Sequence, residues 1–218
     1  LRWFFRKPII VAYLISPLIG VVLLPCEAIS QPVKNFRTFT VILDSGHNPM
    51  KGGTRSTRGI KEVNYNDQLV ALLKKELLSI DRIQVILTRE PEEHLELNER
   101  AVMANKHKAD LFISIHHDSA QLKYLEKLDV SGELGYSTEN QIQGYSLFVS
   151  RQNKTFEGSL KFARILGKEL RKINRVPSHH HAENIKGENR ILLFPDLGIY
   201  LYDELVVLKK TFMPAILF

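Results

Sequence analysis

The sequence of 218 residues predicts an α/β fold, a single domain with a mostly parallel central sheet flanked by helices. Two observations lead to this prediction. Short apolar, β-branched segments alternate along the chain with longer amphipathic segments, which is the pattern of strand–helix units around a parallel sheet. The composition, with 44% hydrophobic and 25% charged residues, is that of a globular protein. A chain of this length can bury a sizeable core without disulfides.

Each element is predicted from its local pattern. Short apolar runs such as TFTVILD and DLFISIH predict buried strands, and apolar residues at three- and four-residue steps predict helices. The expected strands are 38–44, 84–88, 110–116, 145–150, 190–194 and 214–218. The expected helices are 61–79, 97–108, 158–174 and 203–210. Gly, Ser, Asn and Pro make 45–59 a loop, and 121–143 is expected to be an irregular insertion that acts either as a lid or as a plain surface excursion.

The helix over 158–174 has the most regular apolar face. Its apolar positions recur at helical spacing and should all pack on the sheet. They are Leu160, Ala163, Leu166, Leu170 and Ile173.

Residues 1–30 have the pattern of a secretory signal. Arg2, Arg6 and Lys7 precede an apolar stretch over 8–25, and a small-x-small ending favours cleavage after Ser30. The alternatives are an uncleaved anchor, in which 8–25 would be the contact with the membrane, and lipidation at Cys26. We therefore expect an exported protein, of the periplasm or cell envelope, with a mature domain over 31–218.

Charge and motifs exclude several classes of protein. The net charge is +6, of which residues 1–30 carry +2, so the remainder is mildly basic and suits anionic partners. No helix-turn-helix or RNA-binding signature occurs, so nucleic acid is not an expected partner. No P-loop or Gly-x-Gly-x-x-Gly is present. The single cysteine excludes an intrachain disulfide and a cysteine-based zinc finger.

Two polar clusters follow predicted strands, at 44–47 and 116–118. Ligands of α/β proteins bind beyond the carboxyl ends of parallel strands, so these clusters are candidates for a site. His47, Glu62 and His116 have the ligand types of a zinc (Zn2+) site with one open position. Spacing alone leaves other roles open: a loop histidine, a helix N-terminal carboxylate and a strand-end hydrogen bond. His117 competes with His116 as a ligand. Neighbouring residues of a strand face opposite ways, so only one of the two should face the metal.

Several motifs resemble the zinc-dependent N-acetylmuramoyl-L-alanine amidases of the type 3 amidase domain family. The resemblance extends from residue 39 to 218, and its motifs occur in the family's order. They are VILDSGH at 41–47, Gly59-x-x-Glu62, LTR at 87–89, Leu97-x-x-x-Arg100-x-x-x-Ala104-Asn105, ADLFISIH at 109–116 and MPAIL at 213–217.

The resemblance implies the fold, the ligands and the reaction. His47, Glu62 and His116 would be the zinc ligands, with His116 preferred over His117 because the ligand directly follows Ser-Ile. The implied reaction hydrolyses the amide bond between N-acetylmuramic acid and L-alanine in peptidoglycan, for cell-wall remodelling and daughter-cell separation. Peptidoglycan is the implied partner, and an activator protein is a further candidate partner.

The resemblance also implies a catalytic glutamate that this sequence does not contain. In the family, the strand that begins Pro-Ala-x-Leu carries it, and here its place comes directly after Phe218. We therefore expect the domain to be incomplete at its C-terminus, with no catalytic residue among the 218. The alternative is a catalytically inactive amidase-like domain that binds peptidoglycan or regulates another hydrolase.

Two further features have open interpretations. The tract His179-His180-His181, after Pro177, is either a metal-binding tract or a solvated turn. Arg190 either binds a carboxylate of the substrate peptide or forms a surface ion pair.

Overall fold

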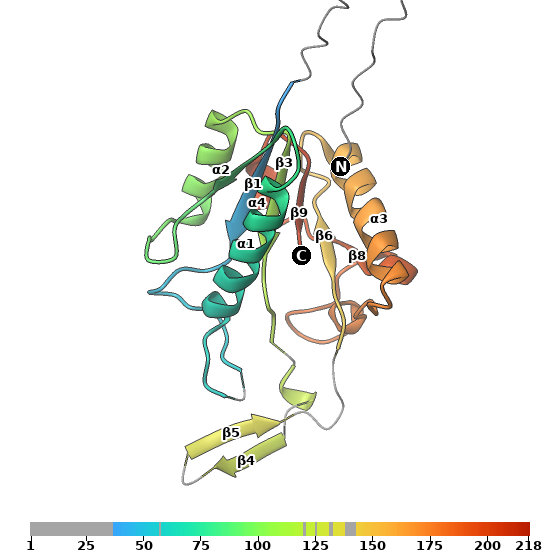
Figure 1. Ribbon diagram of the computed structural model, residues 1–218. Coiled ribbons are helices and arrows are strands. Elements are labelled where there is room, and N and C mark those ends of the chain that lie inside the picture. Colours follow the sequence, from blue (N-terminus) through green and yellow to red (C-terminus); the bar gives the residue numbers. More distant parts are fainter. Residues whose placement is uncertain (1–36, 57, 120, 125, 131–132, 138–142) are drawn as a thin grey trace, which may run out of the picture. The chain divides into compact units, whose positions relative to one another are not determined.

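The computed structural model describes residues 37–56, 58–119, 121–124, 126–130, 133–137 and 143–218 (Figure 1). The predicted signal over 1–30, with the apolar stretch 8–25 and Cys26, lies outside these residues. Within the described part, no helix combines the length and the apolar character needed to cross a bilayer.

A seven-stranded sheet forms the centre of the described domain. Its order is β2-β1-β3-β9-β6-β8-β7. The strands are β1 (Phe39–Ser45), β2 (Ile83–Leu87), β3 (Leu111–Ile115), β6 (Leu147–Val149), β7 (Leu192–Phe194), β8 (Ile199–Leu201) and β9 (Ala215–Leu217). Four of the six pairings are parallel, and β6/β9 and β7/β8 are antiparallel. The predicted α/β class with a mostly parallel sheet is confirmed.

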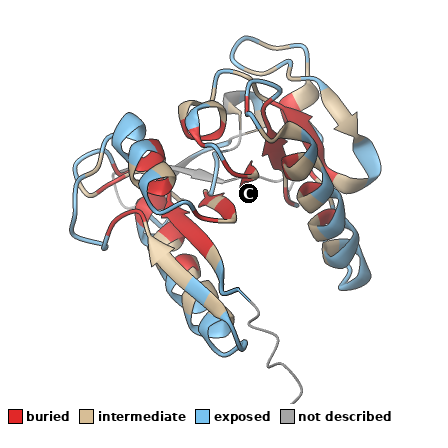
Figure 2. Cartoon of the chain, turned by 90° about the horizontal axis from the view of Figure 1, so that it is seen from above, coloured by how far each residue is buried: buried red, intermediate tan, exposed pale blue. Residues whose placement is uncertain are grey.

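Helices cover both faces of the sheet. They are α1 (Glu62–Leu78), α2 (Leu97–Lys106), α3 (Phe156–Lys172) and α4 (Val206–Lys210). The central strands and the inner sides of the helices are buried, the edge strands β2 and β7 are half-buried, and the outer sides of the helices are exposed (Figure 2). This is the layered arrangement expected when each element has one apolar side.

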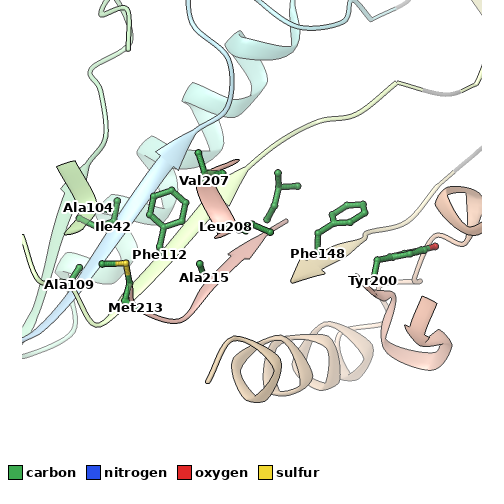
Figure 3. Close-up of a cluster of buried hydrophobic side chains, with 11 residues drawn as sticks. Ile42, Ala104, Ala109, Phe112, Phe148, Tyr200, Val207, Leu208, Met213 and Ala215 are labelled. Carbon is green, nitrogen blue, oxygen red and sulfur yellow. The ribbon is translucent and has the colours of Figure 1, made fainter. Parts of the chain in front are cut away.

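Alternation along the strands decides which residues meet which helix. Val41 and Leu43 of β1 pack with Val70 of α1, whereas Ile42 between them packs with Ala104 of α2 on the opposite face. The cluster around Ile42 also contains aromatic residues and residues of α4, as Figure 3 shows. Its buried members are Ile42, Ala104, Ala109, Phe112, Phe148, Tyr200, Val207, Leu208, Met213, Ala215 and Leu217. A third cluster joins α3 to β6, β8 and β9.

Three details differ from the sequence-based expectation. The strand β8 was not predicted. The insertion over 121–143, expected to be irregular, contains a 3-10 turn (Leu122–Tyr124) and an antiparallel hairpin of β4 (Glu126–Val130) and β5 (Glu133–Ser137). Helix α3 ends at Lys172, so the prediction that Ile173 packs on the sheet is wrong: this residue caps the helix and is 64% exposed.

The topology places the two polar clusters together. Strands β1 and β3 are parallel neighbours, with Ser45 in register with Ile115. Both therefore end at the same edge of the sheet, with His47 beyond one end and His116 beyond the other. Helix α1 begins close to this edge, because the backbone N–H of Glu62 bonds to Thr54 in the loop that follows β1.

Candidate metal centre

His47, Glu62 and His116 converge at this edge. Nε2 of His47 lies 3.0 Å from Oε2 of Glu62, and Nδ1 of His116 lies 2.9 Å from Oε1 of the same carboxylate. The two imidazole rings meet edge to face, with centroids 5.0 Å apart. One potential ligand atom from each residue lies within 4.8 Å of the other two. The structure thus brings together the three side chains that the sequence singled out.

Glu62 is the buried anion of this group, with 5% exposure. Burial alone would raise the pKa of its carboxyl group. Hydrogen bonds and electrostatic attraction from His116 and His47 outweigh this effect and hold the pKa well below its ordinary value. The backbone N–H of Thr54 is a further donor, 3.3 Å from Oε2. A carboxylate anion therefore faces two imidazoles at neutral pH.

Two arginines hold the backbone at His47. This residue has a φ of 65°, in the left-handed region that non-glycine residues seldom occupy. Its carbonyl oxygen accepts hydrogen bonds from Nε of Arg89, at 3.0 Å, and from NH2 of Arg100. Arg100 is 1% exposed and also donates to the buried carboxylate of Asp44, at 2.9 Å. These bonds fix the strained turn that directs the His47 side chain toward Glu62.

Arg89 and Arg100 both lie in motifs of the sequence, but a role for either one was not predicted. Arginine is a surface residue in most contexts, and no local pattern marks either one as buried. Their spacing relative to apolar neighbours was the only available signal, since both fall within segments that otherwise pack on the sheet.

Two glycines leave room for the three side chains. A Cβ atom at Gly46 would lie 2.3 Å from Nε2 of His116, and one at Gly53 would lie 2.5 Å from Oε2 of Glu62 and 2.7 Å from Nε2 of His47. Gly53 also has a φ of 73°, which favours glycine. Larger residues at these positions would displace the side chains that converge here.

The imidazole of His117 has a different partner, and only the backbone N–H of this residue reaches the group, donating to Oε1 of Glu62 at 3.2 Å. Nδ1 of His117 lies 2.8 Å from Oδ1 of Asn66, whose amide nitrogen in turn donates to the carbonyl of Gly46 at 3.1 Å. Burial lowers the pKa of His117, which favours its neutral form. The alternation of side chains along the strand thus separates His116 from its neighbour, as expected.

A cavity of about 780 Å³ lies over this site. His47, Glu62 and His116 line it, together with Arg190 and the chain's last residue, Phe218. Such a cavity is large enough for a small-molecule or peptide ligand.

The cavity lining also includes His180 and His181 of the histidine tract, and Arg190. His181 is 3% exposed, so the interpretation of the whole tract as a solvated turn is wrong, although His179 is exposed. Arg190 pairs with Glu188 and lies over the ring of Tyr202, 4.1 Å from its centroid. Arg190 therefore forms an ion pair, as one of the two alternatives predicted, but the two side chains are largely buried and do not form a surface pair.

Comparison with known proteins identifies the family. The profile of the family described as N-acetylmuramoyl-L-alanine amidase matches residues 41–218, which include every residue of the site. This chain belongs to that family. The predicted resemblance is thereby confirmed.

Individual relatives agree with this assignment. The amidase AmiC of Escherichia coli O6:H1 is 26% identical over 206 residues, covering 82% of this chain and 48% of that protein. The chain spans about half the length of the curated relatives with which it aligns most extensively. Among solved structures, an N-acetylmuramoyl-L-alanine amidase from Clostridium difficile 630 has the same fold, with a TM-score of 0.58, 24% identity, and coverage of 84% of this chain and 78% of that one.

A second solved structure contains a partner protein. It is the CwlD amidase from Clostridioides difficile in complex with the GerS lipoprotein. Its TM-score to this chain is 0.55 at 20% identity, and the match covers 82% of this chain and 80% of that one. At this identity the likeness concerns the fold.

Proposed function

We propose that this chain is a zinc-dependent amidase domain that hydrolyses the amide bond between N-acetylmuramic acid and L-alanine in peptidoglycan. The observation that carries the proposal is the convergence of His47, Glu62 and His116 within 4.8 Å at the cavity, in a chain that belongs to the amidase family. Cell-wall remodelling and daughter-cell separation are the roles proposed for this activity.

The donor set fits zinc. Two imidazole nitrogens and one carboxylate oxygen are ligands that leave a tetrahedral zinc one open position. The Glu62 carboxylate is buried, and a buried anion needs a cation or several donors to offset its lost hydration. The spaces beside Gly46 and Gly53, which a Cβ would fill, keep the ligand side chains free of steric conflict.

Zinc bound by these residues would supply a Lewis acid for the scissile carbonyl and lower the pKa of the attacking water. Other residues of the protein would keep the zinc ligands in place. Arg89 and Arg100 would keep His47 in its strained position, and Asn66 would keep His117 away from the ligand group. We propose that the positive charge of Arg190, which also lines the cavity, binds a carboxylate of the stem peptide.

The general base is proposed to be a glutamate encoded directly after Phe218. Strand β9 lies beside β3, because the backbone N–H of Phe218 bonds to Ser114 and the N–H of His116 bonds to the carbonyl of Phe218, both at 2.9 Å. A residue following Phe218 would therefore emerge beside His116. General acid–base assistance contributes about 10²–10⁴-fold to such reactions. Sequencing the gene beyond the codon for Phe218 tests this point, and any other residue there would contradict it.

Zinc content tests the ligand assignment. His47→Ala and His116→Ala should each abolish zinc binding at this centre, measured by elemental mass spectrometry after dialysis of the purified chain. The matched control is His94→Ala, because His94 lies on the surface and pairs with Glu96 at 3.0 Å. Full zinc retention at this centre in either ligand variant would refute the assignment.

Digestion of purified sacculi tests the reaction. With the chain read through the codons beyond Phe218, the products should be stem peptides with free L-alanine amino termini. Muropeptides cleaved only between sugars would indicate a glycosidase instead. Sedimentation with sacculi without any product would favour the alternative function, an inactive amidase-like domain that binds peptidoglycan or regulates another hydrolase.

We further propose that the protein is exported to the periplasm or cell envelope by residues 1–30. An activator protein is a proposed partner, by analogy with the lipoprotein complex of the structural neighbour. A fusion of residues 1–30 to a reporter enzyme that is active only outside the cytoplasm tests the export, and no reporter activity would contradict it.

A further inference from the structure

A second group of metal-binding side chains lines the same cavity. It consists of Asp118, His180 and His181. Asp118 follows β3 two residues after His116, whereas the histidines lie at a 3-10 turn (His180–Ala182) between α3 and β7. One ligand atom from each lies within 4.8 Å of the other two. The two segments are distant in sequence, so only the fold brings these side chains together.

The distance between His181 and Asp118 suits two ligands of one metal better than a hydrogen bond. Nε2 of His181 lies 3.5 Å from Oδ2 of Asp118. A charge-assisted bond between such groups is about 2.7–2.9 Å long. Two ligands at about 2.0–2.1 Å from a tetrahedral zinc are separated by about 3.3–3.4 Å. The observed separation is therefore close to the second value.

The other ring nitrogen of each histidine is already held by a partner. Nδ1 of His181 lies 2.9 Å from Oε2 of Glu188, and Nδ1 of His180 lies 2.6 Å from Oγ of Ser178. Histidines that bind metals nearly always use their second nitrogen in this way, which fixes the ring and directs the first nitrogen at the ion. In both residues Nε2 is the nitrogen left for a ligand.

Nε2 of His180 is the strongest single indication. It is buried, and no hydrogen-bond partner within the described residues reaches it. A buried polar atom without a partner is costly unless an ion or water satisfies it. The ring of His180 lies against that of His181, with centroids 3.8 Å apart, and one potential ligand nitrogen of each lies within 4.8 Å of the other.

We propose that Asp118, His180 and His181 bind a second divalent metal ion of the zinc type. The charges around it fit this assignment. Glu188 is paired with Arg190, so Asp118 supplies the anionic ligand. The Asp118 side chain is 60% exposed and lines the cavity, so an ion held there would be reachable from the cavity. An ion there would bind a carboxylate or carbonyl oxygen of a ligand that spans the cavity. This proposal goes beyond the proposed function and does not depend on it.

Zinc stoichiometry of the full purified chain tests the proposal. The chain is stripped with a chelator, titrated with Zn2+ alone and analysed by elemental mass spectrometry and calorimetry. Unaltered protein should bind two ions, whereas His180→Gln and Asp118→Asn should each bind one. Asp118→Asn is the variant least able to disturb folding, because the Asp118 side chain is 60% exposed.

The matched control is His179→Gln. His179 belongs to the same tract but is exposed and bonds through Nε2 to the carbonyl of Pro195 at 3.0 Å, so this variant should still bind two ions. His47→Ala should retain the second ion and lose the first. A single ion in the unaltered chain that disappears in His47→Ala and persists in His180→Gln would overturn the proposal. A single ion with the reverse dependence would support it and refute the primary ligand set instead.

Discussion

Replacing Arg100 with methionine should destabilise the domain strongly. Its guanidinium is 1% exposed and donates to the carboxylate of Asp44 at 2.9 Å, to the carbonyl of Ser45 at 2.5 Å and to the carbonyl of His47. The substitution leaves the Asp44 carboxylate without its cation in a place with 1% exposure. Removing one partner of a buried ion pair costs about 3–5 kcal/mol. That is a large part of the roughly 5–15 kcal/mol by which a domain is stable.

Urea unfolding followed by circular dichroism measures this loss. The matched control is Arg37→Met, since the Arg37 side chain is 74% exposed in its ion pair with Asp110 and should contribute less than about 1 kcal/mol. The double variant Arg100→Met/Asp44→Asn should lose less than the sum of the two single variants, because it contains no unpaired buried charge.

The same substitution should weaken zinc binding. Without Arg100, the carbonyl of His47 keeps only the bond from Arg89, and the strained backbone at His47 can relax. Two results would refute the reasoning about the buried pair. One is a loss of unfolding free energy below about 1 kcal/mol in Arg100→Met. The other is a loss in the double variant that equals the sum of the losses in the two single variants. Unchanged zinc affinity in the folded fraction would refute the positioning role of Arg100.

Three further outcomes are expected. Gly46→Ala should leave the fold intact but displace the ring of His116, which lowers zinc affinity at least tenfold by calorimetry; an unchanged affinity would count against the steric argument. Leu208→Ala should cost about 2–5 kcal/mol in urea unfolding, because Leu208 is fully buried, and a loss under 1 kcal/mol would show that the core collapses around the cavity. Burial would raise the pKa of Asp203, but hydrogen bonds from Arg151 hold it below its ordinary value. The pair therefore stabilises the fold above about pH 4 and loses this contribution as the pH falls through the lowered pKa. Asp203→Asn should thus make the loss of unfolding free energy between about pH 5 and pH 2 less steep, and an unchanged slope would contradict the assignment.

Local patterns predicted the elements that are long and regular. Strands β1, β2 and β3 and helices α1, α2 and α3 lie close to their expected positions, because apolar periodicity depends only on nearby residues. The short strand β8 and the hairpin of β4 and β5 were missed. Strand β8 is decided by its pairing with β6, which is distant in the sequence, and the local sequence contains no trace of that partner. Strands β4 and β5 were missed although they pair with each other and are close in the sequence.

The candidate site was predicted only in part. His47, Glu62 and His116 could be named because their residue types and strand-end positions are visible in the sequence. The burial of His181 could not be predicted, since a run of three histidines after a proline resembles an exposed turn. Its burial depends on Phe148 and Tyr200, whose rings lie against it edge to face. These contacts join segments more than 18 residues apart.

The sequence by itself determined the α/β class, the polar residues at the strand ends and the family to which the chain belongs, because these follow from local periodicity and from short motifs. The tertiary structure alone decided which polar residues meet. Burying Asp44, Glu62 or Arg100 is favourable only when distant partners offset the lost hydration, and those partners are assembled by the parallel pairing of β1 with β3. For the same reason, the meeting of Asp118 with His180 and His181 becomes visible only in the folded chain.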